Sequence, residues 1–414
     1  MNSTGNRVRP VEEHQEAVRA LLEHSLKPRT EHRALAAAAG RILAQDLTAP
    51  GSLPPFANSQ MDGYAVNSAQ LAGPDGSLVE LAVAAPIPAG TEAPPLPAGT
   101  AAPIMTGAML PDGADAVVPI ERSQPDTFYA PQDRVGARVR LPAGVPAGQF
   151  VRAAGSDIAA GTPALAKSTR LGPAQLGLLA ALGIPAVPVL APVRVALLST
   201  GDEVVEPGQD LGTGQIHDAN TTLLAASLAE AGAEVIRSRI LADSPEDFRA
   251  ALRDELGHGQ ADLVVTSGGI SKGAYEVVRL ALAAEGVEFF SVAMQPGGPQ
   301  GLGAVDGVPF LAFPGNPVSA LVSFEVFLRP ALTALTGLPR PRREVRAVLA
   351  EAADSPAGKL QVRRGRFRDG RVELIGGPGS HLVHALAESN ALVLVPAGTG
   401  HLPPGTEVTV WLLE

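Results

Sequence analysis

Between residues 191 and 337 the chain alternates short apolar runs with amphipathic stretches of about 10 to 15 residues. The run VRVALLST is almost continuously apolar, which is typical of a strand buried on both faces. Ser244 is expected to cap the helix SPEDFRAALRDEL, with Pro245 at its first position, and Asn220 to cap NTTLLAASLAEAGA. This alternation predicts a parallel sheet with helices on both faces. The expected strands are 193–200, 234–241, 261–267, 287–294 and 308–313, and the expected helices are 220–233, 244–256, 274–286 and 316–335.

The regions on either side of this segment have different patterns. The pattern of residues 11–26 predicts an amphipathic helix with Val18, Leu21, Leu22 and Leu26 on its apolar face. Residues 31–47 suggest a second helical piece that stops at Gly40. From 51 to 148, short β-prone runs divided by Pro and Gly predict an inserted all-β unit, and a helical pattern returns at 172–184. After residue 338 the pattern is β again, which predicts a small barrel. The fold class is therefore a multidomain α/β protein, and its expected domains are 8–50 with 149–190 (helical), 51–148 (β insertion), 191–337 (α/β) and 338–414 (β-barrel).

Composition narrows the classes of function. Of the 414 residues, 45% are hydrophobic and 18% charged, so sizeable cores can be buried. The net charge of −10 argues against a protein that binds nucleic acid or a membrane surface. The absence of cysteine excludes disulfides, iron–sulfur clusters and thiolate-bound zinc. No secretory signal and no uncharged apolar run of about 18 residues is present, so a soluble cytoplasmic protein is expected.

Three expected strand ends carry sequences that can bind an anion. They are TGDE after the first strand, GGIS after the third and PGNPVS after the last. In open parallel sheets, ligands bind beyond the carboxyl ends of the strands, and glycines allow backbone amides to approach an anion closely. One such loop alone is more often a plain strand–helix turn. Three at one sheet edge favour a crevice for an anionic ligand.

Carboxylates at the same edge would repel bare phosphate. A divalent cation between carboxylates and phosphate oxygens would resolve this conflict, and Mg²⁺ typically takes one or two carboxylates plus substrate oxygens. For Asp243, near a helix start, a capping role is an equal alternative. The sequence contains neither a dinucleotide fingerprint nor a Walker motif, so a dehydrogenase or P-loop enzyme is weakly supported. The carboxylates are Asp202, Glu203, Asp218, Asp243 and Glu276.

Six motifs, in order, resemble the molybdopterin molybdenumtransferase family, which includes the C-terminal domain of gephyrin. They are NSQMDGYAV, IMTGAMLPDGADAVV, STGDEVVEPG, GQIHDAN, TSGGISKG and FPGNPVSA, and the resemblance covers nearly the whole chain. It implies a four-domain homodimer whose active site is shared between subunits. It also implies a reaction in which molybdate is inserted into adenylylated molybdopterin, with Mg²⁺-dependent cleavage of the pyrophosphate bond and release of AMP. The adenylyltransferase and molybdoenzymes are further implied partners.

The resemblance implies roles for individual residues. Asp62 and Thr106 would approach the ligand from the partner subunit, and Glu203, Asp243 and Glu276 would bind metal and polarise the phosphoanhydride. These five are the expected catalytic residues. The expected substrate-binding residues are Gly201, Asp202, Asp218, Asn220, Ser267, Gly268, Gly269, Ser271, Lys272, Pro296, Pro299, Pro314, Gly315, Asn316 and Ser319.

Two departures from the family pattern bear on these roles. The family commonly has Asp where this chain has Glu276, which is longer by one methylene. The family's KPGKP is QPGGP here (295–299), so two cations are lost, and Lys272 is hypothesised to restore charge; a solvated surface lysine is the alternative.

Two other functions remain to be compared. A molybdopterin adenylyltransferase shares the α/β domain but lacks the β insertion and the barrel. A gephyrin-like scaffold would not need the acidic sheet edge.

Overall fold

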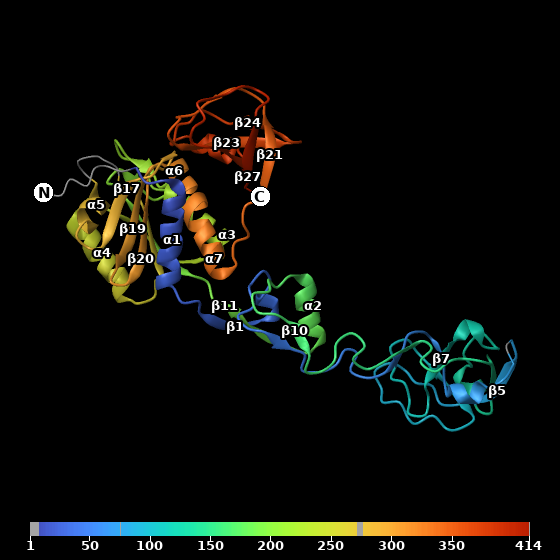
Figure 1. Cartoon of the computed structure of the whole chain (residues 1–414). Helices are drawn as coiled ribbons and strands as arrows, with labels where there is room; N and C mark the ends of the chain where they lie inside the picture. Colours follow the sequence, from blue (N-terminus) through green and yellow to red (C-terminus); the bar gives the residue numbers. More distant parts are fainter. Residues whose placement is uncertain (1–7, 75, 271–275, 414) are drawn as a thin grey trace. The chain divides into compact units, whose positions relative to one another are not determined.

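The computed structural model describes residues 8–74, 76–270 and 276–413, in two compact units. Unit 1 contains the chain up to Glu31 and from Leu190 onward, and unit 2 is His32–Val189. Figure 1 shows the elements of both units coloured along the sequence. The four-domain division drawn from the sequence stays a prediction, although the first helix, α1 (Val11–Ser25), packs within unit 1.

A six-stranded sheet in the order β15-β12-β16-β20-β19-β17 forms the centre of unit 1. Its first four strands are parallel, as predicted, whereas β19 is antiparallel to both neighbours. The strand β19 was not predicted; it forms a hairpin with β20 through Asp306 and Gly307, both at positive φ, which is the Asp-Gly hairpin turn. The strands are β12 (Arg194–Thr200), β15 (Glu234–Leu241), β16 (Leu263–Ser267), β17 (Val287–Ser291), β19 (Pro299–Val305) and β20 (Val308–Phe313).

Helices cover both faces of this sheet (Figure 1). Alternate residues of β12 enter two different cores: Val195 and Leu197 pack with α1, α3 and the helix after β20, and Ala196 and Leu198 pack with α4 and α5. This is the period of two expected of a strand buried on both faces. The helices are α3 (Ala219–Glu230), α4 (Pro245–Gly257), α5 (Val277–Leu282), α6 (Pro317–Ser323) and α7 (Arg329–Thr336).

A π-helical turn, η5 (Phe324–Leu328), joins α6 to α7 into one stretch, Pro317–Thr336. Among the helices that the structure describes, this stretch alone is long and apolar enough to cross a membrane, and 72% of its apolar window is buried. A buried core helix passes the same test of length and composition. Glu325 and Arg329 lie within it, both buried.

Two predicted local structures need correction. Asp218, not Asn220, caps α3: its carboxylate accepts a hydrogen bond from the Thr221 backbone N–H at 3.0 Å. Ser244 caps α4 with Pro245 at its first position, as predicted. The helical piece expected at 31–47 is absent, because the chain there forms β1 (Thr30–Ala34) and a single 3₁₀ turn, η1 (Leu35–Ala37). Burial of apolar side chains from 35–43 against the core of unit 2 overrides the helix propensity of the alanines.

The C-terminal part of unit 1 is the predicted barrel. Its strands are hydrogen-bonded in the spatial order β23-β24-β21-β27-β25, and β25 also pairs with β23, which closes the barrel. A short strand of the preceding part, β18 (Met294–Gln295), pairs in parallel with β23, which joins the barrel to the α/β part. The elements are β21 (Glu344–Leu349), β22 (Ala353–Asp354), β23 (Leu360–Arg368), β24 (Arg371–Leu374), α8 (Val383–Ala387), β25 (Ala391–Val395), β26 (His401–Leu402) and β27 (Glu407–Leu412).

Unit 2 contains the predicted β insertion, built on a five-stranded sheet in the order β7-β4-β6-β5-β8. Gly63 begins β4 where a Cβ would lie 2.0 Å from the Val118 carbonyl oxygen, so the close approach of β4 and β7 requires glycine. The remaining elements are β2 (Leu47–Thr48), β3 (Asn58–Ser59), β4 (Gly63–Val66), η2 (Ser68–Leu71), β5 (Leu78–Val83), β6 (Thr100–Ile104), β7 (Ala116–Pro119), η3 (Ile120–Arg122), η4 (Pro131–Asp133), β8 (Arg138–Pro142), β9 (Val151–Arg152), β10 (Pro163–Leu165), α2 (Pro173–Ala181) and β11 (Ala186–Leu190).

His14 makes the stability of unit 1 depend on pH. It is 1% exposed and packs edge-on against Phe290 and Phe327. Burial, and then the charge of Arg9, lower its pKa from 6.5 to about 3. Because the folded state resists protonation there, stability should fall as pH drops below 6.5, by roughly 2 kcal/mol at pH 5. Urea unfolding at pH 7 and pH 5 should show a smaller difference for His14→Leu than for the parent; an equal difference would contradict the assignment.

Candidate functional site

The three predicted strand-end loops converge on one cleft of about 1020 Å³ in unit 1. The ends of β12, β16 and β20 form its floor and one side, as expected for an open α/β sheet. Ser271 and Lys272 lie outside the residues that the structure describes. The predicted residues that line the cleft are Gly201, Glu203, Asp218, Asn220, Asp243, Ser267, Gly268, Gly269, Glu276, Pro296, Pro299, Pro314, Gly315, Asn316 and Ser319.

A chain of hydroxyl groups forms the floor of the cleft. Thr221 Oγ1 donates to the buried Asp218 carboxylate and lies 2.8 Å from Ser199 Oγ, which lies 3.1 Å from Ser267 Oγ. These bonds join α3 to the neighbouring strands β12 and β16. Asp218 and Ser267 therefore hold the floor together, in addition to bordering the space above it.

Glycines allow the loops to pack on one another. A Cβ at Gly268 would lie 2.8 Å from the Thr200 carbonyl oxygen, and one at Gly269 would lie 2.9 Å from Val277 and Val278 side-chain atoms. Both glycines have positive φ, which other residues rarely adopt. A Cβ at Gly315 would lie 3.3 Å from the Gly268 Cα. The backbones of two loops are therefore nearly in contact.

Two residues that line the cleft each carry a buried oxygen atom with no hydrogen-bond partner among the described residues: Thr200 Oγ1 and Asn220 Oδ1. The Asn220 Nδ2 donates to the Gly315 carbonyl oxygen at 2.6 Å, so its amide has a fixed orientation. Thr200 was missed by the sequence analysis. Unpaired buried polar groups are costly, which makes both residues candidates for contact with a ligand.

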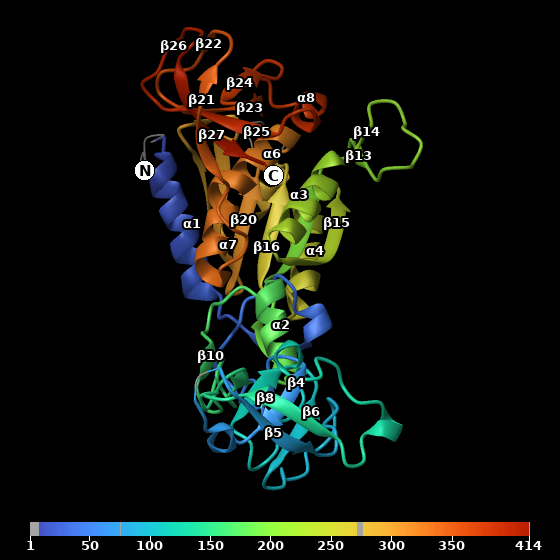
Figure 2. The same cartoon turned by 90° about the vertical axis from the view of Figure 1, so that its right-hand side faces the viewer.

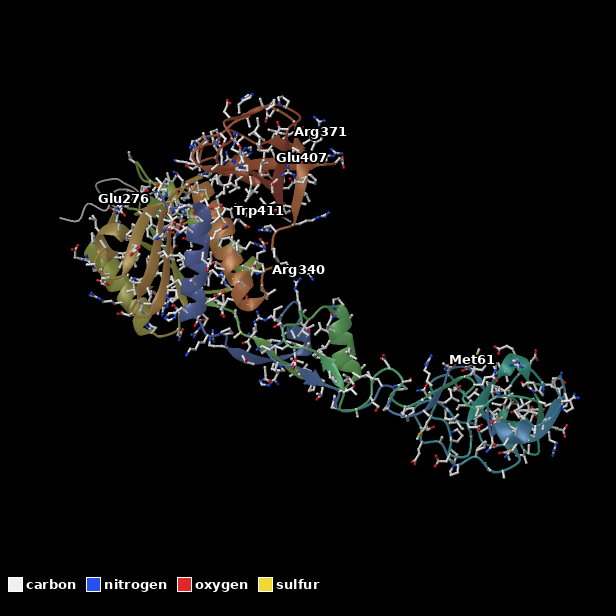
Figure 3. The ribbon with its side chains drawn as sticks, viewed as in Figure 1. Met61, Glu276, Arg340, Arg371, Glu407 and Trp411 are labelled. Carbon is white, nitrogen blue, oxygen red and sulfur yellow. The ribbon has the colours of Figure 1, made fainter. Side chains whose placement is uncertain are left out.

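Carboxylates gather at the edge of the cleft. The Asp243 N–H donates to Asp202 Oδ1 at 2.9 Å, and the Asp202 N–H is 3.5 Å from Asp243 Oδ2. Burial and then the charges of Asp202, Glu203 and Glu276 raise the pKa of Asp243, against the lowering effect of the Asp202 N–H. Figure 3 shows Glu276 at the same end of the α/β part as α6. The acidic cluster predicted from sequence is therefore present in space.

These carboxylates do not by themselves form a complete metal cage. Within residues 8–74, 76–270 and 276–413, no group of three or more His, Asp or Glu side chains is arranged to hold a metal ion. Their chemistry nevertheless fits Mg²⁺, which takes few protein carboxylates and completes its shell with water and ligand oxygens.

We expect Asp243→Asn to stabilise the ligand-free protein. A raised pKa means that the charged carboxylate costs stability as pH rises above its ordinary value of 3.8. The variant should therefore melt at a higher temperature than the parent at pH 7.5, with the gain vanishing towards pH 4. Added Mg²⁺ should raise the melting temperature of the parent more than that of the variant. A lower melting temperature for the variant at pH 7.5 would contradict the electrostatic assignment.

The segment QPGGP forms another wall, held from behind. The buried Gln300 donates its Nε2 to the Gly297 carbonyl oxygen and to Ser323 Oγ, both at 2.7 Å. Ser323 Oγ donates in turn to the Ser319 carbonyl oxygen at 2.7 Å. A Cβ at Gly297, whose φ is +92°, would lie 2.7 Å from the Met294 Cε. The wall is thus fixed to α6 without any cation of its own.

A further wall comes from the barrel, which was not predicted to be part of the site. The Val318 N–H, in the first turn of α6, donates to the Ser380 carbonyl oxygen at 3.1 Å. Two buried arginines hold this loop: Arg363 donates to the Gly376 carbonyl at 3.1 Å, and Arg364 donates to the Gly379 carbonyl at 3.0 Å and to the Gly377 carbonyl. The barrel residues that line the cleft are Lys359, Pro378, Gly379, Ser380, His381 and Val383.

The barrel provides a positive charge, that of Lys359, which the QPGGP wall lacks. Lys359 and His381 are exposed and line the cleft. The hypothesis that Lys272 restores positive charge falls outside the described residues, so it remains untested, but Lys359 provides a cation independently. A glycine-rich run, GGPGSH, was the available signal in the sequence; its place beside α6 depends on long-range strand pairing that local pattern does not reveal.

Asp62 and Thr106, the predicted residues of unit 2, lie together. The Asp62 Oδ1 accepts hydrogen bonds from the Thr106 N–H at 2.6 Å and from Thr106 Oγ1 at 2.8 Å. These bonds, backbone first, lower the pKa of Asp62 below its ordinary value. Both side chains are exposed, next to Met61, which is labelled in Figure 3. Asp62 is therefore an ionised carboxylate on the surface of unit 2.

An acidic edge, glycine loops and a barrel wall together define an α/β protein with a cleft for a ligand beyond the ends of its strands. Family models match three consecutive regions: the MoeA N-terminal region (domain I and II) at residues 9–183, a probable molybdopterin binding domain at 196–334, and the MoeA C-terminal region (domain IV) at 346–413.

Relatives match over the full length. Molybdopterin molybdenumtransferase 2 of Mycobacterium tuberculosis is 43% identical over 98% of this chain and 99% of its own. Molybdopterin molybdenumtransferase of Haemophilus influenzae is 35% identical over 92% and 93%. The crystal structure of a molybdopterin biosynthesis MoeA protein from Pyrococcus horikosii has a TM-score of 0.84 and 31% identity, over 99% of this chain and 100% of that one. The chain belongs to the molybdopterin molybdenumtransferase family, a family of transferases.

Proposed function

We propose that the chain inserts molybdate into adenylylated molybdopterin, with cleavage of the pyrophosphate bond and release of AMP. The observation that carries the proposal is the cluster of carboxylates at the cleft edge, where burial and then the neighbouring negative charges raise the pKa of Asp243. Clustered carboxylates would repel an anion bound by the neighbouring glycine loops, so a cation is needed between the carboxylates and that anion. A phosphoanhydride with a bound metal ion supplies both the anion and the cation.

Of the predicted ligands Glu203, Asp243 and Glu276, one or two would hold Mg²⁺ together with water and substrate oxygens. When bound, the ion would withdraw charge from the phosphoanhydride oxygens. Asp202 keeps Asp243 in position through the bond from the Asp243 N–H. The glycine loop at 268–269 would bring backbone amides close to the ligand, and Lys359 of the barrel would add a positive charge. Molybdate and the phosphates thereby gain donors without any thiolate from the protein, which has no cysteine.

We further propose that the protein works as a homodimer in which Asp62 and Thr106 of one subunit serve the cleft of the other. The support is the chemistry of unit 2: an ionised, exposed carboxylate whose Thr106 bonds fix its orientation. Such a group is suited to orient a ligand through its fixed negative charge. The cytoplasmic location and the contacts with the adenylyltransferase and molybdoenzymes remain predictions from the sequence.

The retained acidic cluster favours an enzyme over a gephyrin-like scaffold, which would have no use for it. The barrel and the β insertion, both present, argue against a molybdopterin adenylyltransferase.

The test is incubation of the protein with adenylylated molybdopterin, Mg²⁺ and either molybdate or tungstate, with AMP release and metal incorporation followed together. We expect AMP release that depends on both Mg²⁺ and the oxyanion. A parallel reaction with molybdopterin and ATP tests the adenylyltransferase alternative. No AMP release with either oxyanion would overturn the proposal.

A further inference from the structure

His217 lies at the border of the cleft, between the acidic edge and the start of α3. It belongs to β14 (Ile216–His217), which pairs with β13 (Val204–Val205), directly after Glu203. The Ile216 N–H donates to the Glu203 carbonyl oxygen and the Asp218 N–H to the Val205 carbonyl oxygen, each at 2.8 Å. The backbone of His217 is thus held on both sides. Figure 2 shows the loop between β13 and β14 extending from the sheet edge.

The ring of His217 is held in one orientation. Its Nε2 lies 2.9 Å from the Gln209 carbonyl oxygen, inside this loop. A carbonyl oxygen only accepts, so Nε2 carries the hydrogen and donates it. Nδ1 has no hydrogen-bond partner among the residues that the structure describes, and the side chain is exposed to the cleft. The loop therefore fixes the tautomer and leaves the second ring nitrogen available to a ligand.

The position of His217 determines which part of a ligand it can meet. Of the described basic side chains that line the cleft, Lys359 and His381 come from the barrel, and His217 alone comes from the α/β part. It follows the strand that pairs with the residues after Glu203. A ligand group that reaches the cation at Glu203 therefore also comes near His217. Under the proposed function, that group is the nucleotide half of the substrate.

We propose that His217 binds the nucleotide half of adenylylated molybdopterin, and the AMP released from it, through a hydrogen bond at Nδ1. The inference rests on the proposed function and adds a specificity-determining residue to that site. Nδ1 accepts this bond, because the hydrogen is on Nε2, so its donor is a hydroxyl or amino group of the nucleoside. The other ring nitrogen, Nε2, holds the loop through its bond to Gln209 and does not contact the ligand.

Two amide substitutions separate the two nitrogens. Glutamine places its amide nitrogen near the position of Nε2, so His217→Gln keeps the bond to Gln209 and loses Nδ1. Asparagine places its amide near Nδ1, so His217→Asn keeps a polar group for the ligand and loses the bond to the loop. Calorimetric binding of AMP, adenosine and inorganic phosphate, each with Mg²⁺, should be compared for the parent and both variants, after thermal unfolding confirms that the variants fold.

We expect His217→Gln to weaken AMP binding roughly tenfold, the loss of one hydrogen bond to a ligand. His217→Asn should weaken it less, and molybdate binding should be unchanged in both. A loss shared by adenosine locates the bond on the nucleoside, as expected, whereas weaker binding of inorganic phosphate would contradict the acceptor role of Nδ1. AMP binding by His217→Gln equal to the parent would overturn the inference, as would a greater loss in His217→Asn. If the parent binds no AMP, the proposed function fails first.

Discussion

Replacing Glu203 with glutamine should lower the rate of AMP release by roughly a hundredfold, the typical cost of removing one group that stabilises charge in a transition state. Glu203 lines the cleft and its charge contributes to the raised pKa of Asp243. Glutamine has nearly the same shape but cannot hold a divalent cation with a full charge. The loss should therefore appear in turnover, while the fold remains intact.

A neighbouring carboxylate provides the matched control. Asp210 lies in the same loop region, is exposed and does not line the cleft. Asp210→Asn makes the same change of charge, so it should leave AMP release within about twofold of the parent, as surface changes away from a site usually do. Equal losses in Glu203→Gln and Asp210→Asn would show that net charge, not the position of Glu203, governs the rate.

The same variant tests the shared site. Asp62→Ala and Glu203→Gln should each be nearly inactive alone. In a mixed population about half of the dimers are heterodimers, each with one intact site of two, so about a quarter of the parental activity should return. Exchange of subunits is verified first. If the activity of the mixed population then does not recover, the proposal that Asp62 serves the partner's cleft is refuted.

The second large effect is expected from Glu325→Ala, which should lower the free energy of unfolding of unit 1 by about 3–5 kcal/mol. The Glu325 side chain is fully buried in the π-helical turn. Arg342 donates to it twice, at 2.7 and 3.0 Å, and Arg329 lies 3.6 Å away. Arg342 also reaches Glu230 and the Leu413 carbonyl oxygen. Removing the carboxylate leaves two guanidinium groups largely buried, with only the half-exposed Glu230 beside them.

Unfolding can be followed through Trp411, the single tryptophan of the chain, which lies on the barrel (Figure 3). The control is the exposed pair of Glu407 with Arg346, 3.1 Å apart. Glu407→Ala should cost less than about 1 kcal/mol, because exposed ion pairs contribute little. A similar cost for both variants would contradict the importance of burial at Glu325.

Local pattern in the sequence was sufficient for the central architecture. The near-continuous apolar strand at 194–200 and the Ser244–Pro245 helix start are properties of a few adjacent residues, and both appear as predicted. The cap of α3 was misplaced by two residues, because Asp218 and Asn220 are both good caps and only the chain direction after β14 decides between them.

What the sequence did not reveal depends on distant pairing. The Asp-Gly hairpin of β19 and β20 has a local signal that was overlooked, so it was available in principle. The barrel wall of the cleft was not, since Lys359 and His381 reach the site only because β18 pairs with β23 and Ser380 meets α6. His217 was quoted within a motif but had no assigned role until the Gln209 bond fixed its ring.

Within the part of the chain that the structure describes, the two arginines that hold the barrel loop donate only to main-chain carbonyl groups, at Gly376, Gly377 and Gly379. These hydrogen bonds therefore do not involve the side chains of the loop, such as those of Pro378 and His381. Under the proposed function, substitutions at Pro378 or His381 would alter the face that the loop presents to an oxyanion, while the attachment of the loop persists. A small library at these two positions is accordingly the natural starting point for shifting the preference between molybdate and tungstate.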